Sequence, residues 1–153
     1  MKKLMVYGIK EELYHEMDQK LSIQFKEKAK PLDIIWGVMN RIVVMAIKDG
    51  DLNALKMIYY NQALFLNETE RDCIVPLRES TRISLIILQN RGFTKVKILK
   101  QNSCNICQQF ADKIYSISEA LEKMPIPCPD CQTIIFKGSS GFCRCIYIPT
   151  KDA

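Results

Sequence analysis

The apolar residues in the first part of the chain recur with the period of an α-helix. Between residues 9 and 30 they occupy every fourth position, at Ile9, Leu13, Met17, Leu21 and Phe25. This spacing places them in one narrow stripe along a helix whose other sides are charged. Pro31 then ends this helix or begins the next one, because proline is tolerated in the first turn of a helix but not in its interior.

Three further helices are predicted before the pattern changes. Residues 32–48 are apolar on nearly all sides, which is typical of a central, buried helix. Gly50 and Asp51 follow as a C-cap and an N-cap, so we expect a third helix over 52–67. The fourth helix is expected over 76–90.

After Gly92 the hydrophobic period becomes that of a β-strand. Residues 94–99 alternate polar and apolar side chains, as a half-buried strand does. Shorter segments are typical of a second strand at 113–116, a short helix at 118–124, and a hairpin with strands at 133–137 and 142–148. The sequence thus predicts an α+β protein, with a helical domain over 1–91 and a small β-rich domain over 92–153.

Six of the seven cysteines lie in the second domain, as three pairs: Cys104 and Cys107, Cys128 and Cys131, Cys143 and Cys145. A Cys-x-x-Cys sequence places two sulfurs on one tight turn, close enough to share a metal ion. Four such ligands complete the tetrahedral site of a structural zinc. We therefore expect Zn²⁺ as a structural cofactor that compensates for the small hydrophobic core of this domain.

The number of sulfurs does not match a simple arrangement. Six thiols exceed one tetrahedral site and fall short of two separate ones, which need eight ligands. The single histidine, His15, lies on the first predicted helix and is interpreted as a solvated surface residue. A binuclear cluster sharing six cysteines is not predicted, because about twenty residues separate Cys107 from Cys128 and such clusters have closer spacing.

Two sets of four ligands remain open. Cys104 and Cys107 with Cys128 and Cys131 would give the two-knuckle geometry of a zinc ribbon. The same first pair with Cys143 and Cys145 would instead join one knuckle to the last strand. Cys104 and Cys107 belong to both sets and are the firmest ligand assignments.

Disulfide bonds are the alternative use of these cysteines, and they are typical of oxidising compartments. Residues 1–30 contain no secretory signal, so we expect a cytoplasmic protein with reduced thiols, in which Cys73 is a buried apolar side chain. Membrane association is not expected either. The most apolar stretch, residues 32–47, includes Asp33 and Arg41 and is shorter than the roughly 20 residues that span a bilayer.

Three segments of the second domain resemble the C-terminal region of phage minor-head (head-morphogenesis) proteins. They are Ser103–Cys107, Asp112–Leu121 and Gly141–Pro149, within a match of about residues 94–149. The resemblance implies a zinc-stabilised module and favours as ligands Cys104, Cys107 and one or both of Cys143 and Cys145.

The chain departs from this family at one informative place. The histidine that the family has just before Cys-Arg-Cys is absent, and Gly141 and Phe142 stand there. Cys128 and Cys131 are the candidates for the replacement ligand. Only about 90 helical residues precede the match, so the resemblance implies a shared module of phage or mobile-element origin and not the full capsid role.

The sequence shows no constellation typical of catalysis. A site closed by thiolates offers no open coordination position to a substrate. The acidic residues Glu68, Glu70 and Asp72 are typical of a solvated helix end, with a magnesium site of a nuclease as the alternative reading. We do not expect an enzyme.

A basic stripe is a second candidate binding feature. The net charge of +5 is compatible with nucleic acid as a partner. Arg78 and Arg82 are one turn apart on the fourth predicted helix, and Lys95 and Lys97 share one face of the following strand. These four cations are the candidate phosphate contacts.

The leading hypothesis is a non-enzymatic, zinc-binding interaction protein whose helical region binds a protein partner. The alternative hypothesis is a nucleic-acid-binding protein that uses the basic stripe. A metal-dependent nuclease is the third.

Overall fold

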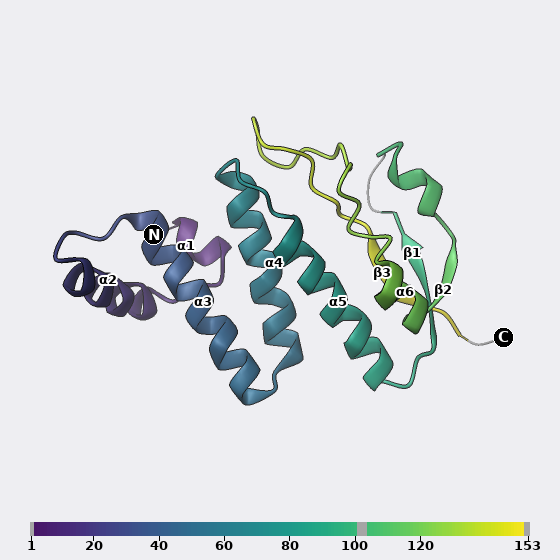
Figure 1. The fold of residues 1–153 in the computed structure, drawn as a ribbon, viewed down its shortest axis with the longest axis horizontal. Coiled ribbons are helices and arrows are strands. Elements are labelled where there is room, and N and C mark those ends of the chain that lie inside the picture. The colour runs from purple at the N-terminus through teal and green to yellow at the C-terminus, as the bar shows by residue number, and fades with distance from the viewer. Residues whose placement is uncertain (1, 101–103, 152–153) are drawn as a thin grey trace.

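The computed structural model describes residues 2–100 and 104–151 of the chain. Its first part is helical, and the helices span Lys2–Val6 (α1), Glu11–Phe25 (α2), Pro31–Asp49 (α3), Leu52–Glu68 (α4) and Ile74–Asn90 (α5). Helices α2, α3, α4 and α5 follow one another across the molecule, with α1 near α3 and α4 (Figure 1). The four predicted helices are confirmed, and the short α1 was not predicted.

The predicted helix caps explain where α3 and α5 end. Gly50 adopts a left-handed conformation, with φ of 65°, and its N–H donates to the carbonyl oxygens of Ala46 and Ile47. The side chain of Asp51 accepts a hydrogen bond from the N–H of Ala54 at 2.9 Å and so begins α4. Gly92, with φ of 88°, follows α5 and turns the chain toward the sheet.

A three-stranded antiparallel sheet follows the helices. The first strand, Lys95–Leu99 (β1), lies in the middle, between Ile114–Ser116 (β2) and Ile146–Pro149 (β3). The expected alternation is confirmed in β1, where Val96 and Ile98 are buried.

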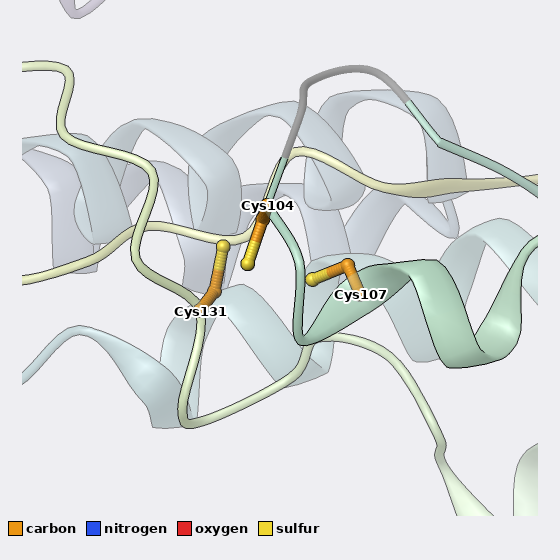
Figure 2. A group of neighbouring side chains, drawn as sticks. All are labelled: Cys104, Cys107 and Cys131. Carbon is orange, nitrogen blue, oxygen red and sulfur yellow. The ribbon is translucent and has the colours of Figure 1, made fainter.

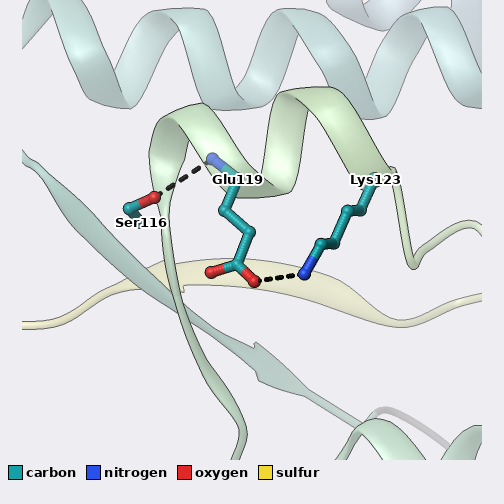
Figure 3. A network of polar contacts seen from close by, with 3 residues as sticks. All are labelled: Ser116, Glu119 and Lys123. Carbon is teal, nitrogen blue, oxygen red and sulfur yellow. Dashed lines mark hydrogen bonds and ion pairs between the residues drawn. The ribbon is translucent and has the colours of Figure 1, made fainter.

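A short helix links the sheet to the cysteine-bearing loops. It spans Ile117–Lys123 (α6) and begins at Ser116, whose side chain accepts the N–H of Glu119 at 3.0 Å (Figure 3). Glu119 in turn pairs with Lys123 at 2.6 Å, one helical turn later. The helix predicted at 118–124 is thereby confirmed.

The predicted hairpin at 133–148 is wrong. Residues 133–137 form no strand, and the strand at the end of the chain pairs with β1 rather than with them. The reason is the burial of Phe142, which is fully enclosed and packs edge-on against Tyr60 of α4 at 5.8 Å between ring centroids. Its N–H still donates to the carbonyl of Thr133, at 2.7 Å, but residues 133–145 form no strand ladder around this bond.

The hydrophobic core has two parts. One contains buried residues of the segments from α1 to α4, among them Ile34, Val38 and Phe65. The other combines residues of α4 and α5 with Val96, Phe142 and the cysteines. The predicted division between 1–91 and 92–153 remains a prediction, but the second core crosses it, because α5 packs on the sheet side as well as on α4.

Candidate metal centre

The six cysteines of the C-terminal region come from three separate loops. Cys104 and Cys107 lie between β1 and β2, and Cys107 begins a 3₁₀ turn over Cys107–Phe110 (η1). Cys128 and Cys131 lie in the loop after α6, and Cys143 and Cys145 directly precede β3. Five of the six are buried, and Cys145 is half-buried. All seven cysteines of the chain are free thiols, so none forms a disulfide.

Two of the loops bring together a first group of three sulfurs. Cys104, Cys107 and Cys131 have sulfur atoms within 4.8 Å of one another. Figure 2 shows the three side chains converging, two from the turn after β1 and one from the loop after α6. The three residues are all buried, so solvent does not separate the sulfurs.

A second group of three sulfurs overlaps the first. It consists of Cys107, Cys143 and Cys145, again within 4.8 Å of one another. Cys107 is therefore the member that both groups share. Cys128 is in neither group, although its backbone hydrogen-bonds the sulfur of Cys143.

Backbone donors stabilise charge on one of these sulfurs. The N–H of Gln132 donates to the sulfur of Cys104 at 3.4 Å. This bond is the main reason why the pKa of Cys104 falls to about 7, and the backbone of Cys107 lowers it further. About half of the Cys104 thiol is therefore ionised at neutral pH to the thiolate, the form that binds metal.

Burial acts in the opposite direction on the neighbouring thiols. It raises the pKa of Cys143 to about 12 and that of Cys107 above its usual range. The charges of nearby sulfurs add to both shifts. Without a metal ion, these crowded thiols remain protonated at neutral pH, and a bound cation would remove the repulsion between thiolates.

The donor set fits a soft or borderline metal ion. Thiolate sulfurs are ligands that zinc prefers, and closely grouped, buried sulfurs are typical of structural rather than catalytic sites. Among the described residues, neither predicted ligand set forms a group of four sulfurs that all lie within 4.8 Å of one another. Cys107 belongs to both predicted sets. In the structure it lies near Cys131 from one set and near Cys143 and Cys145 from the other.

Two residues outside the cysteine pairs hold the loops in place. A Cβ atom on Gly141 would lie 1.5 Å from the carbonyl oxygen of Cys131, so the two backbones meet where no side chain fits. Asn67 of α4 is fully buried and donates to the carbonyl of Ser140 at 3.0 Å. Neither role is predicted from the sequence. The glycine lay in a segment typical of a hairpin turn, and nothing local marks Asn67.

The predicted basic stripe is divided by the sheet. Lys95 and Lys97 lie on the face of β1 opposite its buried residues. Arg78 and Arg82 come from α5, which packs on the core side of the sheet, and Arg82 pairs with Glu79 at 3.5 Å. Binding of nucleic acid by these four residues remains a prediction.

The remaining candidates do not converge on a site. His15 is exposed and lies 3.7 Å from Glu11, as expected of a surface residue. Glu68 accepts a hydrogen bond from the hydroxyl of Tyr7, whereas Asp72 accepts the N–H of Ile74 at the start of α5. Glu68 and Asp72 are thus engaged in separate contacts.

The comparisons with known proteins add no relative. No protein-family model, curated protein or solved structure matches the chain. In the part of the chain that the structure describes, no helix is long and apolar enough to cross a membrane.

Proposed function

We propose that this chain is a zinc-binding interaction protein in which the metal has a structural role. The observation that carries the proposal is the convergence of buried cysteine sulfurs from three loops, within 4.8 Å in each of two groups. Such loops have little regular structure of their own, and metal binding would supply the free energy that orders them.

The position of the sulfurs supports a structural role. The centre lies within the same hydrophobic core as Leu77 and Leu85 of α5 and Phe142. A metal ion there would fix the Cys128–Cys145 region to the turn after β1 and so complete the packing of the sheet on α5. In a region of this size, a metal commonly replaces missing apolar burial.

The helical region supports an interaction role. Helix α3 exposes several large apolar side chains, and Val44, Met45 and Ile47 are 65%, 47% and 59% exposed. Exposed apolar groups on one helix are typical of surfaces that meet another macromolecule. We propose a protein partner for this region. The resemblance to phage minor-head proteins leads us to propose a phage or mobile-element origin for the metal module.

Metal analysis tests this function directly. The protein, purified under reducing conditions, is expected to contain zinc by elemental analysis, and chelation is expected to lower its melting temperature. The matched control is Cys73→Ser, which alters the one cysteine outside the three pairs. Wild-type protein that contains no metal and melts unchanged after chelation would overturn the proposal.

A further inference from the structure

The arrangement of sulfurs indicates more than one metal ion. Around a single tetrahedral zinc with Zn–S bonds of about 2.3 Å, every pair of sulfurs lies about 3.8 Å apart. A single site therefore requires four sulfurs that are all mutual neighbours. Among the described residues the sulfurs instead form two groups of three within 4.8 Å, and no group of four.

Cys107 joins the two groups. It is 1% exposed and lies within 4.8 Å of Cys104 and Cys131 on one side and of Cys143 and Cys145 on the other. A thiolate sulfur has several lone pairs and can bind two metal ions at once. We propose that the centre is binuclear, with two Zn²⁺ ions that share Cys107 as a bridging thiolate. This inference rests on the proposed zinc-binding function and specifies its site.

The ligand count agrees with sharing. Two tetrahedral ions offer eight positions. The six cysteines fill seven of them when Cys107 is counted twice, which leaves one position for a second shared sulfur or a ligand from outside the chain. The sixth cysteine, Cys128, is buried, and its backbone hydrogen-bonds Cys143, so it lies beside the second group.

The charges also balance. Six thiols would lose their protons to form six thiolates, and two Zn²⁺ ions would reduce that charge from −6 to −2. A single tetrahedral ion would bind only four of the six sulfurs. The second ion thus gives a role to every cysteine of the three pairs.

The gap of about twenty residues between Cys107 and Cys128 is unlike the close spacing of known clusters that share cysteines, but the fold closes this gap. The gap between Cys107 and Cys128 is occupied by η1, β2 and α6, which return the chain to its starting point beside β1. Six sulfurs can be gathered by close spacing in the sequence. Here they are gathered by the fold, because β3 pairs with β1 and brings the loop before β3 near the loop after β1.

Metal stoichiometry in single-cysteine variants tests the proposal. Wild type and the control Cys73→Ser are expected to bind two zinc ions per chain, measured by elemental analysis and by native mass spectrometry. Cys104→Ser and Cys145→Ser are each expected to retain one ion, because each removes a ligand from one group only. Cys107→Ser is expected to lose both.

Cadmium substitution provides a test that needs no variant. With ¹¹³Cd bound to the wild-type protein, two resonances split by coupling through the shared sulfur are expected in the ¹¹³Cd spectrum. One ion per chain, two uncoupled resonances, or a Cys107→Ser protein that still holds an ion would overturn the bridge while leaving a metal-binding function intact. A wild-type protein without metal would overturn the proposed function itself.

Discussion

At the scale of single residues, the centre depends on the close approach of two backbones. Gly141 has no space for a side chain, because a Cβ there would overlap the carbonyl oxygen and carbon of Cys131, at 1.5 and 2.6 Å. Movement of one backbone would displace Cys131, and movement of the other would shift the segment that leads to Cys143. Gly141, which has no side chain to bind a metal, therefore affects the position of the candidate ligand Cys131.

Gly141→Ala is expected to weaken both folding and metal binding. Relief of the overlap requires movement of Cys131 or of the segment that leads to Cys143, and overpacking of this kind costs about 1–3 kcal/mol. Urea unfolding and elemental analysis measure the two effects. The matched control is Gly50→Ala, at a left-handed position with no neighbour within 4 Å, which is expected to cost about 1 kcal/mol through backbone strain alone and to leave the metal content unchanged. Equal metal content in both variants would contradict the expectation.

The protonation of the thiols predicts the pH dependence of metal binding. The pKa of Cys143 is raised to about 12, so its thiol is protonated at neutral pH, whereas Cys104, with a pKa of about 7, is already about half ionised. Metal binding must displace the protons, and its affinity therefore rises with pH and falls as the solution is acidified. Titration of zinc into metal-free protein in a weakly buffered indicator solution is expected to show proton release. Binding without release of protons would contradict this assignment.

At the scale of elements, the end of α4 holds the last cysteine loop. Asn67, in the final turn of α4, donates to the carbonyl of Ser140 at 3.0 Å and also contacts the sulfur of Cys73 at 3.8 Å. Its side chain is fully buried, and its Oδ1 has no partner among the described residues. The helix thus fixes the chain next to Gly141, where the two cysteine-bearing loops meet.

Asn67→Ala is expected to lower the free energy of unfolding by about 1–3 kcal/mol, because it removes the hydrogen bond to Ser140 and the packing of a fully buried side chain. It is also expected to weaken metal retention against a chelator. Asn61→Ala is the matched control, because Asn61 of α4 likewise donates to a backbone carbonyl, that of Tyr7 at 3.1 Å, far from the cysteines. The control is expected to lose stability without any loss of metal retention. The same metal retention in both variants would argue against this role of Asn67.

Prediction from the sequence succeeds where the signal is local. The helices follow from a 3.6-residue period and from caps such as Gly50 and Asp51, and β1 follows from its alternation. The hairpin failed because Phe142 is buried against Tyr60, a contact between residues about eighty positions apart that no local pattern contains. The spacing of the cysteine pairs indicates candidate metal ligands, but their grouping around Cys107 depends on the packing of three loops.

At the scale of the whole molecule, the second hydrophobic core contains residues of α4 and α5 together with residues of the sheet and the cysteine-bearing loops. Leu77 and Leu85 of α5 pack in one core with Val96, Ile98 and Tyr147 of the sheet. Helices α2 and α3 belong to the other core. Loss of the metal should therefore affect α5 as well as the residues after Gly92.

Chelation is expected to increase amide hydrogen exchange throughout residues 92–151, to a smaller degree in α5, and least in α2 and α3. The gradient follows the contacts of the second core, since a helix that loses one of its packing partners opens more easily. Exchange measured by mass spectrometry on the metal-loaded and metal-free protein resolves these segments. An equal increase in α2 and α5 would show that the two cores do not respond separately.

The order of the strands also fixes the order in which the molecule can be completed. The central strand β1 pairs with β2 soon after it in the chain, but with β3 only at Ile146–Pro149. During synthesis, Cys104 and Cys107 leave the ribosome well before Cys143 and Cys145, which directly precede β3. One edge of β1 therefore remains unpaired until the last strand arrives. Closure of the sheet and assembly of the complete set of sulfurs thus become a single, late event in folding.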